Sequence, residues 1–413
     1  MINFEKFVLP NGLKILVHED KSTPLAAINI LYNVGARDEH PEQTGFAHLF
    51  EHLMFGGSVN IPSYDEPLQR AGGENNAFTN NDVTNYYVTL PANNIETAFW
   101  LESDRMLSLA FTEKSLEVQR SVVIEEFKER YLNQPFGDAW LLLRPLAYKV
   151  HPYKWATIGK DISHIQNATL DDVKSFFKKY YCPNNAIMVV AGNIKSDEVK
   201  QLCEKWFASI PPGPDNNRNL PVEPEQTEFR FQTRESEVPV NALYMAYHCC
   251  ARIDEAYYAT DLLADILSRG KSARFYKELV KGKQLFSELD VYATGDFDKG
   301  LMVIEGKLVK GVEIKDAEAA IKEEINKIKN ELVSLDELTK VKNKLESQRQ
   351  FSEMNVLNKA MGLAFAELLG NASLVNEEIN KFLAVTPEQI KEQANILFRD
   401  ANCSILHYIT KSN

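Results

Sequence analysis

The stretch Thr169-Leu-Asp-Asp-Val-Lys174 resembles a second stretch, Thr386-Pro-Glu-Gln-Ile-Lys391, at an offset of 386 − 169 = 217 in the numbering. In both, a threonine followed by acidic or amide residues is typical of a capped helix start. With the same offset Asn185 matches Asn402, and an apolar run with strand character follows each asparagine. The pattern predicts two diverged copies of one unit, although a shared capping pattern alone remains the alternative.

A run rich in proline and asparagine separates the two copies, Ile210-Pro-Pro-Gly-Pro-Asp-Asn-Asn-Arg-Asn-Leu-Pro-Val-Glu-Pro224. Its prolines and glycine oppose helix formation, and its polar residues have little to bury. We therefore predict an N-terminal domain at residues 1–210, a linker at 211–226 and a C-terminal domain of similar fold at 227–413.

Strand and helix patterns alternate within the first half. β-branched and aliphatic enrichment predicts strands at 12–19, 26–34 and 187–191, and helical periodicity predicts helices at 44–55, 64–71, 95–109, 113–131, 170–180 and 196–207. Residues 75–79 and 84–90 are typical of a hairpin with its turn at 80–82. The second half repeats the mixture and becomes mainly helical from about residue 316. Each half is predicted to be an α/β or α+β domain, with helices packed on one mixed sheet.

The composition limits the classes of partner. Lys and Arg number 46 against 58 Asp and Glu, a net charge of −12, which argues against a nucleic-acid or anionic-membrane surface. Five irregularly spaced cysteines suit reduced thiols better than a disulfide framework. The N-terminus has no basic start followed by an apolar stretch, and nowhere do about 18 uncharged apolar residues run together. We predict a cytoplasmic protein, neither exported nor anchored, whose partners are peptides, proteins or small molecules.

The most informative chemical motif is His48-Leu-Phe-Glu-His52. On a helix His48 and His52 lie roughly 40° apart, with Glu51 on the same side of the cylinder. Neutral imidazoles are good zinc donors, and the carboxylate between them can accept a proton from a metal-bound water. The order of the residues is the inverzincin pattern, H-x-x-E-H. Because the intervening residues are strongly apolar, burial favours a metal site over an exposed surface pair.

A catalytic zinc site needs a third protein ligand and an open position. The best candidate lies on the predicted helix Leu116–Phe127. If Val123 faces inward, Glu126 lies roughly 60° from it and Glu125 roughly 160°. We predict Glu126 as the third ligand, with Glu125 and Glu129 as alternatives.

The sequence resembles the pitrilysin/insulinase family of zinc peptidases, which includes the mitochondrial processing peptidase and compact bacterial members. The likeness runs along most of the chain, through Val34-Gly-Ala-Arg-Asp-Glu39, Thr44-Gly-Phe-Ala-His-Leu-Phe-Glu-His-Leu-Met-Phe-Gly-Gly57, Asn76-Ala-Phe-Thr79, Val122-Val-Ile-Glu-Glu126 and Tyr181-Cys-Pro-Asn-Asn185. The length of the segment between His52 and Glu126 (126 − 52 − 1 = 73) also fits the family's spacing.

The resemblance implies a role for each motif. His48, His52 and Glu126 would bind one zinc ion per chain, and Glu51 would be the general base. Asn76 and Ala77 would belong to an edge strand that pairs with the bound peptide, although capping of the nearby turn is an alternative for Asn76. The implied fold is two similar domains enclosing a cavity, which favours peptides or unfolded segments as substrates.

The sequence departs from the family pattern in two places. Many members carry an acid seven residues before the third ligand, where this chain has Gln119. Active single-chain and homomeric relatives also place an Arg and a Tyr in the second half, where this chain has Val280 and Ser287. Neither side chain can replace the missing group, because valine cannot donate a hydrogen bond and serine is shorter than tyrosine.

We therefore expect a dimer in which this chain supplies the zinc and a related subunit supplies the Arg and Tyr. Nearby Arg274, Tyr276 and Tyr292 are alternatives within the chain. The second half shows no metal motif of its own, and His248 and His407 lie in apolar strand patterns.

The predicted function is that of a zinc-dependent endopeptidase, a processing-peptidase-like hydrolase. The alternatives are a non-catalytic scaffold and a peptide-binding subunit of a larger complex.

Overall fold

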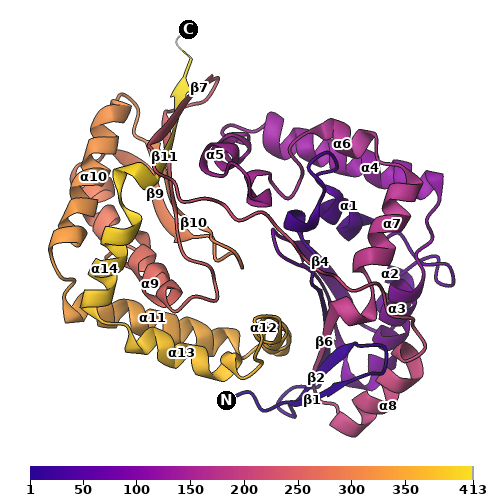
Figure 1. Cartoon of the computed structure of the whole chain (residues 1–413). Helices are drawn as coiled ribbons and strands as arrows, with labels where there is room; N and C mark the ends of the chain where they lie inside the picture. Colours follow the sequence, from indigo (N-terminus) through magenta and orange to yellow (C-terminus); the bar gives the residue numbers. More distant parts are fainter. Residues whose placement is uncertain (412–413) are drawn as a thin grey trace. The chain divides into compact units, whose positions relative to one another are not determined.

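A computed structural model describes residues 1–411; residues 412 and 413, which close the predicted C-terminal domain, lie outside the described residues. The contacts divide the chain into two compact units (Figure 1). The first unit contains Met1–Phe127, Trp155–Leu220 and Arg349–Glu377. The second contains Lys128–Lys154, Pro221–Gln348 and the chain from Glu378 onward.

The first unit is built on a mixed sheet. Its strands follow the order β1 (Glu5–Val8), β2 (Lys14–Glu19), β6 (Ala186–Gly192), β3 (Leu25–Tyr32), β5 (Thr84–Pro91) and β4 (Glu74–Thr79). Only β2 and β6 pair in parallel; the other neighbours are antiparallel. Every residue of β6 is buried, as expected for an apolar strand covered on both faces. Strand β4 pairs only with β5 and forms an edge of the sheet.

The sheet of the second unit repeats this topology without a counterpart of β1. Its order is β7 (Arg230–Ser236), β11 (Cys403–Thr410), β8 (Ala242–His248), β10 (Leu301–Leu308) and β9 (Phe286–Ala293). Again one neighbouring pair, β7 and β11, is parallel and the others are antiparallel. The starts of β3 and β8 differ by the same offset as the sequence repeat (242 − 25 = 217), and so do those of β5 and β10 (301 − 84 = 217). The predicted fold class, two similar mixed-sheet halves from an internal duplication, is confirmed.

Helices cover both sheets. Those of the first unit are α1 (Phe46–Leu53), α2 (Asp65–Arg70), α3 (Ile95–Leu107), α4 (Glu113–Phe127), α6 (Ile162–Gln166), α7 (Leu170–Tyr180), α8 (Ser196–Phe207) and α12 (Val356–Leu368). Those of the second are α5 (Ala139–Ala147), α9 (Ala256–Ser268), α10 (Ile314–Asn330) and α14 (Pro387–Leu397), while α11 (Leu335–Ser352) and α13 (Leu374–Ala384) cross a unit boundary. Both α7 and α14 begin with a capping box, at Thr169 and Thr386. No helix among the described residues has the length and apolar character needed to cross a bilayer.

The two units exchange equivalent helices. In the first unit α12, from the C-terminal half of the sequence, packs against β3 and β6. In the second unit α5, from the N-terminal half, packs against the corresponding strands β8 and β11. The starts of α5 and α12 also differ by the repeat offset (356 − 139 = 217). The compact units therefore differ from the predicted halves 1–210 and 227–413, because a local pattern identifies a helix but not the sheet that it covers.

Candidate metal centre

Helix α1 has a tightly specified beginning. Its N-cap is Gly45, with φ of 90°, where an added Cβ atom would lie 2.7 Å from the carbonyl oxygen of Ile158. The buried carboxylate of Glu39 accepts hydrogen bonds from the backbone N–H groups of Gly45 and Ala47, both at 2.9 Å. A carboxylate at a helix N-terminus satisfies otherwise unpaired donors and is favoured by the helix dipole. These contacts fix where α1 starts and how it is rotated.

The apolar face of α1 packs on aromatic side chains. Phe50, in the middle of the His48–His52 motif, stacks on Tyr181 with ring centroids 5.1 Å apart and lies 5.0 Å from Phe176. Phe50 and Leu49 are fully buried, whereas His48, Glu51 and His52 are partly exposed. Burial of the apolar face thus turns both imidazoles and the carboxylate toward the opposite side of the helix.

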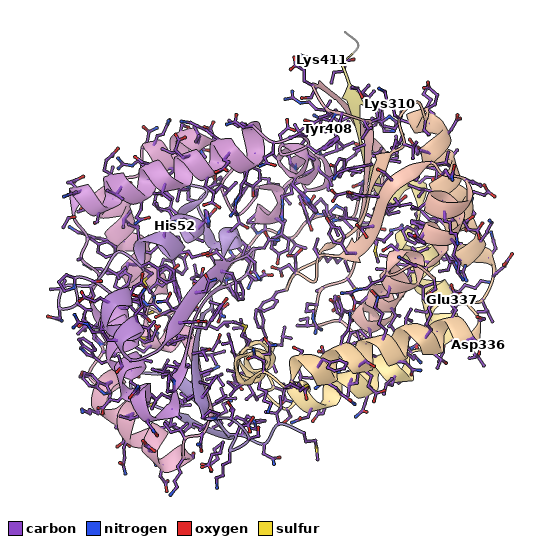
Figure 2. All side chains as sticks on the ribbon, turned by 180° about the vertical axis from the view of Figure 1, so that it is seen from behind. His52, Lys310, Asp336, Glu337, Tyr408 and Lys411 are labelled. Carbon is purple, nitrogen blue, oxygen red and sulfur yellow. The ribbon has the colours of Figure 1, made fainter. Side chains whose placement is uncertain are left out.

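Glu126, in the last turn of α4, joins the two histidines. Its Oε2 atom lies 3.3 Å from Nε2 of His52 and 3.7 Å from Nε2 of His48. One ligand atom from each of the three residues lies within 4.8 Å of the others, and His52 is marked in Figure 2. Ligands about 2.0–2.1 Å from a tetrahedral ion would lie roughly 3.3–3.4 Å from one another. The donor types and spacing therefore fit a zinc ion held by His48, His52 and Glu126.

The alternative carboxylates on this segment lie outside the donor group. Glu125 and Glu129 are both exposed and do not belong to the three-residue group. Helix α4 ends at Phe127 and is followed by a π-helical turn, Lys128–Leu132. Such turns are frequent at functional sites because they redirect side chains.

Glu51 lies beside the edge of the sheet. Burial, and to a smaller extent the Glu51 carboxylate, raise the pKa of the Tyr87 hydroxyl on β5. Tyr87 is paired with Asn76 on β4, and α1 itself packs against β4. A potential proton acceptor, three metal donors and an edge strand are therefore neighbours in one unit.

Asn76 and Ala77 lie on edge strand β4. The amide oxygen of Asn76 accepts a hydrogen bond from the backbone N–H of Ala77 at 2.8 Å, which turns that donor away from β5. Asn76 is exposed and does not cap the hairpin turn. Asn80 does so, because its side-chain oxygen accepts from the N–H groups of Asp82 and Val83, both at 2.8 Å.

The corresponding edge of the second unit is occupied at one residue. On this edge Val291 of β9 pairs with Ile304 of β10. The Ser268 hydroxyl accepts from the Val291 N–H at 2.8 Å and donates to the Val291 carbonyl at 3.1 Å. Helix α9, which precedes β9, has no histidine and carries an ion pair between Asp265 and Arg269. No second group of metal donors occurs within residues 1–411.

The other histidines in strands have structural partners. His407 Nε2 lies 2.8 Å from Glu318, and His248 Nε2 lies 3.0 Å from the Ala147 carbonyl. All five cysteines are free thiols. The capping role of Glu39 is not evident from the sequence, although the residue stands in the family-like stretch 34–39.

Two family models match the chain. Residues 14–136, which contain the whole donor cluster, match the model described as insulinase, peptidase family M16. Residues 167–345 match the model described as the peptidase M16 inactive domain. The chain belongs to peptidase family M16. The M16 relationship confirms the resemblance inferred from the sequence.

Relatives of this M16 chain include proteins named as zinc proteases. Zinc protease PqqE of Helicobacter pylori is 33% identical over 290 residues, covering 69% of this chain and 65% of PqqE, slightly less than two thirds of that protein. The uncharacterized zinc protease YmxG of Bacillus subtilis is 25% identical over 401 residues, covering 96% of each chain. A crystal structure of a protease from Helicobacter pylori matches with a TM-score of 0.93 and 27% identity, covering 99% of this chain and 100% of that one.

Proposed function

We propose that this M16 chain is a zinc-dependent endopeptidase that hydrolyses peptides or unfolded segments. The observation that carries the proposal is the cluster of His48, His52 and Glu126, whose donor atoms all lie within 4.8 Å of one another, close enough to bind one ion. Relatives named zinc protease support zinc as the ion. One zinc per chain is expected, since the described residues contain one such group.

The chemistry divides between the metal and Glu51. Bound zinc would supply Lewis acidity that polarises a peptide carbonyl and lowers the pKa of water. The Glu51 carboxylate, on the same face of α1, is proposed to accept a proton from the attacking water and to deliver it to the leaving amine. The packing of α1 against β4 supports this role, because a peptide on that edge would pass close to α1.

The substrate is proposed to add to β4 as a further strand. Main-chain pairing gives affinity without demanding a particular side chain, which suits a peptidase of mixed specificity. The Ala77 N–H is held by the exposed Asn76 amide, and a substrate carbonyl can replace that acceptor. In contrast, Ser268 already occupies both polar groups of Val291 on β9. At that residue the β9 edge is already hydrogen-bonded, which favours β4, on the unit that carries the donor cluster, as the substrate edge.

We further propose a related partner subunit that supplies an Arg and a Tyr. At the family-matched positions Val280 lies in a π-helical turn, and the Ser287 hydroxyl donates to the Lys307 carbonyl at 3.1 Å. Arg274 makes two hydrogen bonds to Glu337, at 2.9 and 2.8 Å, which supports excluding it as a substitute. Tyr292 donates to Glu305 at 3.3 Å. A cytoplasmic location and a dimer remain predictions.

Metal analysis and one substitution test the proposed function. The purified chain should contain about one zinc per molecule, and Glu51→Gln should keep zinc while losing about 100-fold or more in peptide hydrolysis. A chain that does not bind zinc at neutral pH contradicts the metal assignment and favours the scaffold. A chain that binds zinc and peptide, but hydrolyses no peptide with or without the recovered partner, is a peptide-binding subunit instead.

A pull-down from the source cell tests the partner. Peptide digestion should be slow with this chain alone and at least about tenfold faster when the recovered chain is added, because an oxyanion-stabilising group contributes a few kcal/mol. If the isolated chain already works at full rate and gains nothing from any partner, the partner proposal fails while the peptidase proposal stands.

A further inference from the structure

The first unit contains a pocket formed by three separate segments of the chain. It is lined by the segment that follows α3, by one side of α7 and by the proline-rich segment 210–214. Its volume is about 570 Å³, within the range of roughly 300–1,000 Å³ typical of small-molecule sites. Neither His48, His52, Glu126 nor Glu51 lines it.

The pocket wall is apolar and aromatic. Its lining includes Leu109, Phe111, Phe177, Tyr181 and Ile210. The ring of Phe177 lies 5.3 Å from that of Phe111 and stacks at 6.0 Å on that of Tyr181. An apolar wall of this kind favours the hydrocarbon part of a ligand, because binding removes both surfaces from water.

Two lysines on α7 supply the only charged side chains of the lining. Lys174 and Lys178 are one helical turn apart and exposed. Neither ammonium group has an ion pair or hydrogen bond among residues 1–411, whereas neighbouring Lys179 lies over the Tyr180 ring at 4.6 Å. No acidic residue lines the pocket, although the chain has a net charge of −12. The local charge therefore selects an anion.

We propose that this pocket binds a monomeric anionic amphiphile, a medium-chain fatty acid, with its hydrocarbon chain against the aromatic wall and its carboxylate at Lys174 and Lys178. Binding is non-covalent. The Cys182 thiol in the lining is buried, and burial raises its pKa, which disfavours the reactive thiolate.

The pocket also shares side chains with the support of α1. Phe50 packs on Tyr181 at 5.1 Å and on Phe111 at 6.2 Å, and both rings line the pocket. The ligand therefore contacts the layer on which the His48–His52 helix rests, without touching the donors. The binding site is independent of the proposed peptidase activity, and its test needs no turnover.

Calorimetric titration of the full chain with dodecanoate, below its micelle concentration, tests the proposal. Saturable binding of about one dodecanoate per chain is expected, and dodecyltrimethylammonium, which has the same chain length and a positive head, should bind at least about tenfold more weakly. The double variant Lys174→Gln/Lys178→Gln should weaken dodecanoate binding about tenfold. Lys179→Gln, on the same helix but outside the lining, is the matched control and should change it less than about twofold.

Three results would overturn the site. They are the absence of saturable dodecanoate binding, equal binding of the cationic amphiphile, and equal affinities of the double variant and Lys179→Gln. Sedimentation velocity during the titration can give a fourth such result. If dodecanoate binds only when the chain self-associates, the pocket is occupied by a second copy of the chain. The lysines are exposed, so their replacement should leave the thermal unfolding curve unchanged and the comparison valid.

Discussion

The Oε2 atom of Glu126 lies 3.3 Å from the Nε2 atom of His52, although the two residues stand on different helices and far apart in the sequence. The short distance between Glu126 and His52 depends on the packing of α4 against α1. The capped start of α1 and the aromatic support beneath Phe50 fix one side of the cluster. The donors are thus brought together by the packing of the first unit, as a preorganised metal site requires.

Replacing Glu126 with Gln should remove a metal ligand. An amide oxygen is a weaker donor than a carboxylate, so we expect zinc affinity to fall by more than about 100-fold, beyond what loss of an outer-shell partner costs. Competition with a chromophoric chelator measures the affinity. The matched control is Glu125→Gln, on the same helix but exposed, which should bind zinc as the unmodified chain does. Equal affinities of the two variants would exclude Glu126 as a ligand.

Gly45 should be irreplaceable for two separable reasons. Alanine at φ of 90° costs about 1–2 kcal/mol, and its Cβ atom would also meet the Ile158 carbonyl at 2.7 Å. Gly311, at φ of 88°, has no atom within 4 Å of an added Cβ, so Gly311→Ala isolates the backbone term. In urea unfolding, Gly45→Ala should destabilise the protein clearly more than Gly311→Ala does. Equal losses would mean that the Ile158 contact relaxes without cost.

The exchanged helices predict that residues 1–210 do not fold alone. This fragment lacks α12, whose buried Val356, Ala360 and Leu363 belong to the first unit, and it retains α5, which packs in the second. Loss of α12 would expose apolar surface over β3 and β6. We expect aggregation, or strong binding of an anilinonaphthalene dye, where the full chain shows neither. Cooperative urea unfolding of a monomeric fragment would contradict this prediction.

Local structure was predictable because it depends on short patterns. The predicted helices at 170–180 and 196–207 coincide with α7 and α8, and the hairpin at 75–79 and 84–90 with β4 and β5. The helical wheel predicts that Glu126 faces inward and Glu125 outward. In the structure Glu126 is partly buried and Glu125 is exposed, because α4 is regular up to Phe127. The exchange of α5 and α12 could not be predicted, because two diverged copies offer each helix two similar sheets. The apolar pattern does not distinguish between them.

Below pH 5 the Glu318–His407 contact should contribute to acid unfolding. The hydrogen bond from His407, helped by Lys322 and opposed by burial, lowers the pKa of Glu318 from 4.5 to about 2. Because the pKa is lower in the folded state, the stabilisation is present above about 4.5 and is lost as the pH falls toward 2. Glu318→Gln should therefore reduce the melting temperature at pH 7 and weaken its dependence on pH between 5 and 2. Parallel curves for both proteins, measured calorimetrically, would show that this carboxylate does not contribute.

The edge of β4 supplies a test of the proposed substrate position. Proline at residue 77 removes the N–H that Asn76 now holds, while the ladder to β5 does not use that donor. If a substrate carbonyl accepts from Ala77 during hydrolysis, Ala77→Pro should lower kcat/KM about 2- to 10-fold, the worth of one hydrogen bond. Ala77→Ser keeps the donor and serves as the control. Zinc content and melting temperature should be the same in both variants. An unchanged kcat/KM for Ala77→Pro would then mean that the peptide binds elsewhere.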